Sequence, residues 1–413
     1  MINEKIINGI LDVSESYQAP ARMLELMLDD QKRNETFKKF LEHETDMSYE
    51  WFQDYFEHEH AERKTNKQDF TPRSVSRLLA QLAGQTESYF ESAAGNGGIM
   101  IQSWLQNKDN NDRFYRVEEL SDRAIPFLLF NIAIRNMSGL VLHGDSLTRE
   151  FKAVYELKGS AEGFSTIEQL NENLEPEQQF QTVLMNPPYS AKWSADKEFL
   201  NDPRFSEYKV LAPKSKADFA FLLHGYYHLK ETGIMAIVLP HGVLFRGNAE
   251  GKIRKILLEN GAIDAVIGLP ANIFFNTSIP TTVIVLKKNR STKDVLFIDA
   301  SKDFEKGKNQ NLLKDEHINK ILDVYNKRED VEKYAHVASF KEIVDSDHNL
   351  NIPRFVDTFE EEEPIDIVQL SKEMLETDKQ IQQAEKELSS MLDELAVTNE
   401  SDEMLAALKN VFR

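Results

Sequence analysis

The sequence predicts an α/β fold built on a doubly wound, mostly parallel sheet, with a short helical region before it and a long helix after it. Between about residues 67 and 356, short apolar runs alternate with helical patterns, which is typical of a parallel sheet connected by helices. A glycine cluster follows an early strand, and polar side chains follow three further strands. A chain of 413 residues is long enough to bury such a core and to carry an additional helical piece.

Residues 1–66 are polar and helix-prone, and we expect them to form a short N-terminal helical region. Aromatic residues gather near its end, namely Tyr49, Trp51, Phe52, Tyr55 and Phe56. Aromatic side chains at helical spacing either pack into a core or dock onto a partner. Core packing is the commoner use, and we favour it.

A glycine cluster lies between an expected strand and an apolar helix. Tyr89-Phe90-Glu91 leads into Ser92-Ala93-Ala94-Gly95-Asn96-Gly97-Gly98, and an apolar helical run extends from Ile99 to Leu105. Glycine lets the backbone approach a ligand closely, and the helix N-terminus presents N–H groups to it. The cluster indicates a nucleotide-like ligand, although a single Gly-x-Gly is a weak signal.

Two further strands end in carboxylates. The run from Phe114 ends at Glu118 and Glu119, and an acid at the end of the second strand of such a unit can hold ribose hydroxyls. The run from Leu140 ends at Asp145, whose carboxylate can accept from the exocyclic amine of an adenine. A single acid at such a position is more often a solvated strand end. The two acids indicate a ligand site only because they occur together with the glycine cluster.

The tetrapeptide Asn186-Pro187-Pro188-Tyr189 follows the apolar strand Thr182–Met185. Neither proline can donate to a ladder, and the first restricts the residue before it, so the chain must turn sharply there. Such a turn can present an amide, a carbonyl and an aromatic ring together at the carboxyl edge of a sheet. This grouping suits a planar amine, since two oxygens accept its N–H groups while the ring stacks on its face. The alternative is a plain strand terminator.

The remaining part of the expected sheet is less informative about function. We expect later strands at 233–239, 262–269, 282–286 and 295–298, and we interpret residues 147–180 as an inserted polar surface loop beside the site. The chain has no cysteine, which rules out disulfides and cysteine-ligated metals. The histidines, including His143, His224 and His241, show no metal-ligand spacing, so we predict no metal site.

The chain is strongly acidic, with a formal net charge of −20. Because binding to nucleic acid depends largely on neutralising phosphates, such a chain repels DNA except at a local basic surface or through a partner. Candidate bases follow the Asn-Pro-Pro-Tyr motif: Lys192, Lys197, Arg204, Lys209, Lys214 and Lys216. No run approaches the ~20 apolar residues that span a bilayer, and the start of the chain is not a secretory signal, so we expect a cytoplasmic protein with no membrane partner.

After Pro364 the pattern changes to that of one long helix with an apolar seam. The seam residues recur at intervals of three and four: Ile367, Leu370, Met374, Thr377, Ile381, Ala384, Leu388, Met391 and Leu395. This is a coiled-coil pattern, and it requires either a partner helix or packing back onto the chain's own domain.

These motifs together carry a resemblance to a known family. The chain resembles the methyltransferase (modification) subunits of type I restriction-modification systems, within the adenine-N6 DNA methylases, over about residues 67–395. The resemblance rests on Phe70-Thr71-Pro72-Arg73, Glu91–Gly98, Glu119, Asp145, Asn186–Tyr189, Lys216–Phe221, Leu239–Arg246 and Gly268–Phe275. It implies a Rossmann-like, class I S-adenosylmethionine-dependent methyltransferase domain at 67–356, followed by a partner-binding region at 357–413.

The resemblance also implies an activity and its partners. The activity is that of a site-specific, adenine-specific DNA-methyltransferase, with S-adenosyl-L-methionine as cofactor and a flipped adenine as target. DNA sequence would be read by a separate specificity subunit bound through the C-terminal helix. Whether a restriction subunit also joins stays open.

The implied cofactor-binding residues are Phe70, Thr71, Pro72, Glu91, Ala93, Gly95, Gly97, Gly98, Glu119, Asp145 and Asn186, and the implied catalytic residues are Asn186, Pro187, Pro188, Tyr189 and Phe274. Asn186 and the Pro187 carbonyl would accept from N6 of adenine. Tyr189 and Phe274, favoured over Phe275, would sandwich the base. Asp218 either positions this site or caps a helix.

The chain departs from the family pattern in the glycine loop, at Glu91, Ser92 and Asn96, and before Phe70, at Lys67 and Asp69. Two alternatives therefore stay open. One is methylation of a protein glutamine or an RNA base, since the same tetrapeptide serves any planar amide or amine. The other is a catalytically weak assembly or regulatory protein that keeps the fold for binding.

Overall fold

A computed structural model describes most of the chain. The described residues are 2–53, 55, 70–110, 112–171, 178–274, 278–308, 310–358, 366–394 and 407–408. The chain divides into two compact units, Met1–Thr358 and Phe359–Arg413. Among the described residues, no helix is both long and apolar enough to cross a lipid bilayer.

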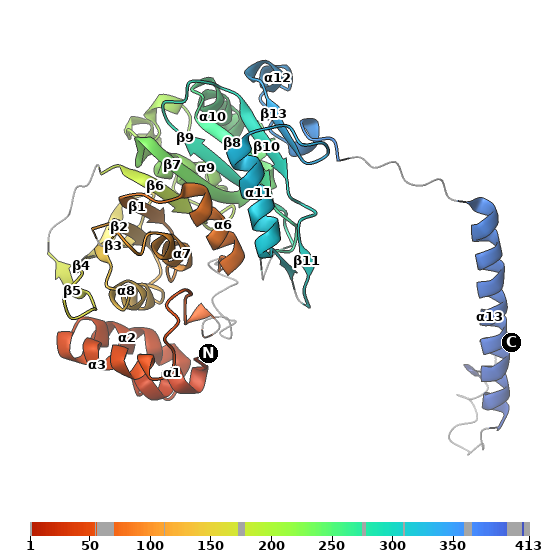
Figure 1. Ribbon diagram of the computed structural model, residues 1–413, viewed down its shortest axis with the longest axis horizontal. Coiled ribbons are helices and arrows are strands. Elements are labelled where there is room, and N and C mark those ends of the chain that lie inside the picture. The colour runs from red at the N-terminus through yellow and green to blue at the C-terminus, as the bar shows by residue number, and fades with distance from the viewer. Residues whose placement is uncertain are drawn as a thin grey trace. The chain divides into compact units, whose positions relative to one another are not determined.

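The first unit is built on a large twisted sheet (Figure 1). Its eleven described strands lie in the order β13-β10-β8-β9-β7-β6-β1-β2-β3-β4-β5. Their bounds are β1 Ser88–Ser92, β2 Phe114–Glu119, β3 Ser138–Asp145, β4 Glu150–Lys158, β5 Thr166–Leu170, β6 Phe180–Met185, β7 Leu229–Pro240, β8 Ile263–Gly268, β9 Thr281–Lys287, β10 Val295–Asp299 and β13 Ala335–Ala338. The short strands β11 Glu305–Lys306 and β12 Asn311–Leu312 form a separate pair.

The centre of the sheet is parallel and doubly wound. Strand β1 pairs in parallel with β2 on one side and β6 on the other, and the parallel pairing continues to β3 and to β7. Strand β9 runs antiparallel between β7 and β8. The predicted fold class and the four later strands are confirmed. The strand order reverses between β1 and β6, and ligands of such sheets bind at the carboxyl ends of the strands there.

Residues 147–180 do not form the predicted polar loop. They contain β4 and β5, which extend the sheet antiparallel from β3. Val154, Leu157 and Ile167 are buried, whereas the residues between them are mostly exposed or half-buried. A strand with one solvated face has a polar composition, and that composition misled the sequence interpretation.

Helices cover both faces of the sheet (Figure 1). One face carries α6 Arg73–Ala83, α7 Gly98–Gln106, α8 Ile125–Ala133 and α11 Asp315–Lys327; the other carries α9 Asp218–Tyr227 and α10 Asn248–Glu259. The alternation of side chains along β6 shows the two cores, because Leu184 packs in the first and Val183 and Met185 in the second. The short helix α12 Phe340–Asp345 follows β13.

The N-terminal helices lie against α8. They are α1 Glu4–Leu11, α2 Ala19–Met27 and α3 Asp30–Leu41, and α2 contacts α8 directly. The rings of Trp51 and Phe52 pack around Phe130, with centroids 6.1 and 5.0 Å away, and Tyr55 is buried. The predicted core packing is confirmed for these aromatic residues, while Phe56 lies outside the described residues. The N-terminal region is thus anchored to the helix that precedes β3.

The second unit is dominated by α13, Ile367–Glu394. The predicted C-terminal helix is confirmed. Within its own unit the helix leaves the apolar seam exposed: Ile367, Leu370, Met374, Ile381, Leu388 and Met391 are all exposed. Leu395 lies outside the described residues, and coiled-coil pairing stays a prediction.

Candidate active site

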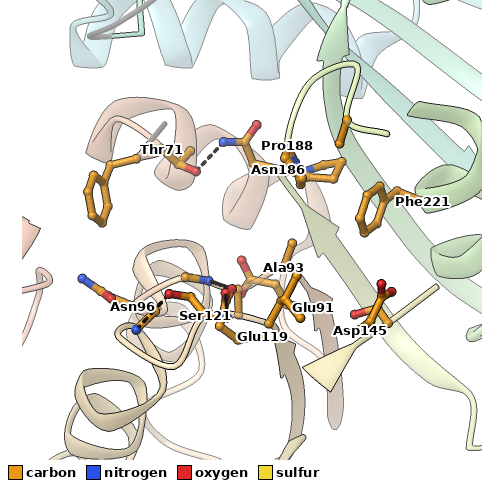
Figure 2. Close-up of a pocket in the computed structure, with 18 of the residues that line it drawn as sticks. Thr71, Glu91, Ala93, Asn96, Glu119, Ser121, Asp145, Asn186, Pro188 and Phe221 are labelled. Atoms are coloured by element: carbon orange, nitrogen blue, oxygen red, sulfur yellow. Dashed lines mark hydrogen bonds between the residues drawn. The ribbon is translucent and has the colours of Figure 1, made fainter. Parts of the chain in front are cut away.

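A cavity of about 950 Å³ opens where β1, β2, β3 and β6 end (Figure 2). The predicted site residues that line it are Phe70, Thr71, Glu91, Ala93, Gly95, Gly98, Glu119, Asp145, Asn186, Pro187, Pro188 and Tyr189. Pro72, Gly97 and Phe274 are not among its lining residues. The strand-end residues that the sequence singled out therefore meet in one place.

The glycine loop leaves space at the cavity wall. Gly95 has a φ of +56°, and a Cβ placed there would meet no atom within 4 Å. Gly97 has a different role. It is the N-cap residue of α7 with a φ of +88°, and a Cβ there would lie 2.8 Å from Cε of Met100. Gly95 is thus the position at which backbone can approach a ligand, while Gly97 permits close helix packing.

Of the two acids that end β2, only Glu119 faces the cavity. Its Oε2 accepts from the Gly95 N–H at 2.7 Å and its Oε1 from the Ser121 N–H at 2.8 Å. Burial raises the pKa of Glu119 above its ordinary value. The carboxylate therefore ties the glycine loop to the end of β2.

Glu91, at the end of β1, is the second buried acid of the cavity. Its Oε2 accepts from the Tyr89 hydroxyl at 2.7 Å. Burial raises the pKa of Glu91 to about 8, and the negative charge of Glu119 acts in the same direction. No described lysine or arginine pairs with Glu91 or Glu119, so a cationic ligand in this part of the cavity would favour the charged forms of both acids.

Asp145 and Phe221 lie together on one side of the cavity (Figure 2). Asp145 accepts from the N–H groups of Leu147 and Thr148 at 2.8 and 3.2 Å, which fixes its carboxylate at the end of β3. Phe221 is a mostly buried residue of α9 that lines the cavity. From the sequence, Phe221 was named only as the end of the Lys216–Phe221 motif and not as a site residue, since an apolar residue on an apolar helix gives no signal of a binding role.

Asn186 is held on both sides of its amide. Its Nδ2 donates to Oγ1 of Thr71 at 2.8 Å, and its Oδ1 accepts from the Tyr189 hydroxyl at 2.8 Å. The first bond joins the Asn-Pro-Pro-Tyr turn to the Phe70-Thr71-Pro72 segment, 115 residues earlier. The rings of Tyr189 and Phe274 meet edge to face, with centroids 5.7 Å apart.

The turn continues into a loop that a buried carboxylate anchors. Ser190 has a φ of +49°, and its N–H donates to Oδ1 of Asp218 at 2.7 Å. Oδ2 of the same residue accepts from Arg246 at 2.5 Å, and Arg246 also donates two bonds to Glu250. These bonds favour a positioning role for Asp218 over helix capping, because they hold the strained residue that follows Tyr189.

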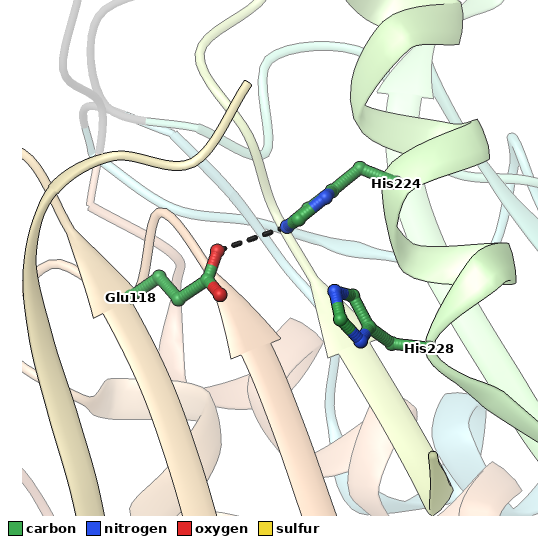
Figure 3. A group of neighbouring side chains, drawn as sticks. All are labelled: Glu118, His224 and His228. Atoms are coloured by element: carbon green, nitrogen blue, oxygen red, sulfur yellow. Dashed lines mark hydrogen bonds and ion pairs between the residues drawn. The ribbon is translucent and has the colours of Figure 1, made fainter. Parts of the chain in front are cut away.

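Glu118 points away from the cavity, toward α9 (Figure 3). It forms a buried group with His224 and His228, whose ligand-type atoms lie within 4.8 Å of one another. The statement that the histidines lack metal-ligand spacing was therefore wrong for His224, since His228 follows it by four residues.

The partners of this group identify it as a buried hydrogen-bond network. Arg204 can only donate, so its 3.0 Å bond leaves Nδ1 of His224 as acceptor and Nε2–H as donor to Glu118, 2.9 Å away. Arg116 donates to the other oxygen of Glu118 at 2.7 Å. Burial lowers the pKa of both histidines, which favours the neutral form of each ring. Two guanidinium groups beside the carboxylate and the ring oppose the binding of a divalent cation.

The same network corrects one predicted DNA contact. Arg204 is buried, donates to the carbonyls of Ser146 and Leu147, and pairs with Asp202 at 2.6 Å, so it faces the interior. Lys192, Lys197, Lys209 and Lys214 are exposed, and Lys216 is half-buried. The loop between Ser190 and Ala217 thus carries its basic surface on lysines alone.

Comparison with known proteins shows the family of the chain. A family model described as N-6 DNA Methylase matches residues 43–364. The chain belongs to the N-6 DNA methylase family. The resemblance predicted from the sequence motifs is thereby confirmed, and residues 43–66 of the N-terminal region are included in the family match.

This chain is similar to proteins of type I restriction systems. It is 33% identical to the methylase subunit of the type I restriction enzyme MpnII from Mycoplasma pneumoniae, over 77% of this chain and 58% of the relative. It is 31% identical to that of MjaVII from Methanocaldococcus jannaschii, over 84% and 58%. The chain thus spans under two thirds of the length of these relatives.

A solved structure shares the fold. The type I restriction-modification system methyltransferase subunit from Streptococcus thermophilus is 44% identical, with a TM-score of 0.64 over 85% of this chain and 75% of that one.

Proposed function

We propose that this chain is the modification subunit of a type I restriction-modification system and transfers a methyl group from S-adenosyl-L-methionine to N6 of adenine in DNA. One observation carries the proposal: Glu119, Asp145 and Asn186 converge on one cavity at the switch point of the sheet. Membership of the N-6 DNA methylase family, and relatives that are methylase subunits of type I restriction enzymes, support it.

The cavity fits the cofactor in charge and in shape. The open side of Gly95 admits a ligand against the backbone, and Glu119 beside it can accept from ribose hydroxyls. Asp145 and Phe221 offer an acceptor and a ring to an adenine. The raised pKa of buried Glu91 indicates carboxylate charge that a cationic ligand would stabilise. When bound, the cofactor supplies an electrophilic methyl group on a sulfonium.

The chain's own residues then orient the target amine. An amide oxygen has two acceptor sites, so Asn186 can keep its bond from Tyr189 and still accept from N6, with the Pro187 carbonyl as the second acceptor. Two N–H bonds to these oxygens draw the nitrogen lone pair out of conjugation and aim it at the methyl carbon. Positioning of this kind needs no metal and no strong base.

The target base must also find room in the site. A base stacked between two parallel rings needs about 7 Å between them, whereas the centroids of Tyr189 and Phe274 are 5.7 Å apart and the rings nearly perpendicular. A flipped adenine can therefore be sandwiched between Tyr189 and Phe274 only after one of these rings moves.

A separate specificity subunit would supply most of the DNA affinity. The chain has a net charge of −20, and its exposed lysines near the site are few. The exposed seam of α13 is the surface we assign to that partner, and a restriction subunit is a further candidate.

A methylation assay with radiolabelled cofactor tests the proposal. The chain, alone and co-purified with its specificity subunit, is given DNA, RNA and protein substrates. We expect transfer to adenine N6 in DNA, only with the partner present. Transfer to protein or RNA would replace the DNA function, and partner binding without cofactor binding would support an assembly protein.

A further inference from the structure

The N-terminal region contributes an acid to the cavity wall. Glu50, which precedes the Phe70-Thr71-Pro72 segment, lines the cavity together with Gln53. Its Oε1 accepts from Nδ2 of Asn131 at 3.0 Å and from the Phe52 N–H at 2.9 Å. Its Oε2 is buried and has no hydrogen-bond partner among the described residues. A buried carboxylate oxygen left without a donor costs folding free energy unless a ligand supplies one.

A second unpartnered polar group lies beside it. Asn96 of the glycine loop also lines the cavity, is 3% exposed, and its Nδ2 has no hydrogen-bond partner among the described residues. Asn131 links the two residues, because the same Nδ2 that donates to Glu50 lies 2.9 Å from the Asn96 carbonyl. One unsatisfied acceptor and one unsatisfied donor therefore lie at the same end of the cavity.

That end is opposite the place suited to an adenine. Figure 2 shows Thr71 and Asn96 on one side of the cavity and Asp145 and Phe221 on the other. A ligand that places its adenine at Asp145 and its ribose at Glu119 extends its remaining part toward Asn96. In S-adenosylmethionine this part is an α-amino acid, which carries an ammonium and a carboxylate.

The segment that carries Glu50 is held firmly. Arg135, in the turn after α8, donates to the carbonyls of Met47 and Tyr49 at 3.0 and 2.7 Å. Gln102 of α7 donates to the Ser48 carbonyl at 2.6 Å, and Arg73 of α6 donates to the Ser48 hydroxyl at 2.7 Å. Side chains from α6, α7 and the turn after α8 thus hold the segment that directly precedes Glu50, so its carboxylate is preorganised.

We propose that Glu50 and Asn96 bind the amino-acid end of the cofactor, with Oε2 of Glu50 accepting from the α-ammonium and Nδ2 of Asn96 donating to the α-carboxylate. This assignment rests on the proposed function and adds to it an essential role for the N-terminal region, which closes the cofactor site. Burial raises the pKa of Glu50 to about 7, as expected for a carboxylate that awaits a cationic partner.

The test compares two ligands that differ only at the amino-acid end. S-adenosylhomocysteine carries the amino acid, whereas 5′-methylthioadenosine keeps the nucleoside and lacks it. Calorimetry with the full chain should show Glu50→Gln weakening S-adenosylhomocysteine roughly 10- to 100-fold while leaving methylthioadenosine within about twofold. Asn96→Ala should show the same selectivity with a smaller loss. Glu42→Gln, at an exposed position of the same region, is the matched control.

The binding measurements distinguish failure of the Glu50 and Asn96 assignment from failure of the proposed function. If Glu50→Gln leaves both affinities unchanged, or weakens both ligands equally, the assignment is wrong. If the wild-type chain binds neither ligand, the proposed function itself fails. If Glu50→Gln does not fold, two results decide: wild type must bind S-adenosylhomocysteine at least about tenfold more tightly than methylthioadenosine, and Asn96→Ala must shrink that ratio. A ratio near one would overturn the assignment without any variant.

Discussion

The two halves of the proposed active site, a cofactor half and a target half, are built in different ways. The cofactor half consists of strand ends and a helix start, with Glu91 and Glu119 buried in the core. The target half consists of the Asn186–Tyr189 turn and the irregular chain that follows it, which is interrupted only by the short 3₁₀ turns Lys197–Asn201 and Ser206–Tyr208. The first half depends on secondary structure, whereas the second depends on side-chain anchors from distant parts of the chain, namely Thr71 and Asp218.

The largest expected effect separates the halves most clearly. Asn186→Ala removes the acceptor for the target amine, and we expect turnover to fall at least about a thousandfold. Cofactor affinity should change less than about fivefold, because the pocket formed by β1, β2 and β3 stays intact. Single-turnover methylation and calorimetry measure the two quantities, and circular dichroism checks the fold. Wild-type turnover in this variant would remove Asn186 from the chemistry.

A smaller effect should follow from loosening the target half alone. Asp218→Asn keeps the volume but loses the ion pair with Arg246, so Ser190 is held less tightly in its left-handed conformation. We expect kcat to fall roughly 10- to 100-fold with unchanged cofactor affinity. Glu250→Gln is the control, since it changes the same network without touching Ser190, and it should cost much less. An equal loss in both variants would indicate a structural role only.

The cofactor half predicts a pH-dependent stability. The pKa of Glu91 is about 8 in the folded chain, above its ordinary value of 4.5, so the folded state binds this proton more tightly than the unfolded state. The contribution of Glu91 to the stability of the cofactor-free chain therefore falls as pH rises from about 4.5 to 8 and then levels off. Glu91→Gln should remove this fall and raise the Tm at pH 8.5 by roughly 2–6 °C, with little change at pH 5. Calorimetric scans at the two pH values measure the difference, and equal shifts at both would contradict the buried-charge explanation.

The difference between the halves also explains what the sequence could predict. Glu119, Asp145 and Asn186 each stand at the end of an apolar strand, and parallel strands bring their carboxyl ends to one edge of the sheet. The local sequence pattern was therefore sufficient to predict that these three residues meet. The bonds of Ser190 to Asp218 and of Glu118 to His224 join residues 28 and 106 positions apart, and no local pattern encodes them. The strands β4 and β5 were missed because they are half-solvated, and Glu50 because its bond with Asn131 joins residues 81 positions apart.

The smallest expected effect concerns DNA and tests whether the target half extends along its loop. Lys209 and Lys214 are exposed, whereas Arg204 in the same loop is buried in the network around His224. Each lysine that contacts a phosphate should contribute a few-fold to DNA affinity and reduce the salt slope by about 1 when replaced by alanine. The measurement is DNA binding by the complex with its specificity subunit at several salt concentrations. Lys255→Ala, at a site paired with Glu259 on α10, is the control. An unchanged slope in both lysine variants would confine the DNA contacts of this chain to the cavity mouth, whereas a reduced slope would show that the loop held by Asp218 also guides the duplex.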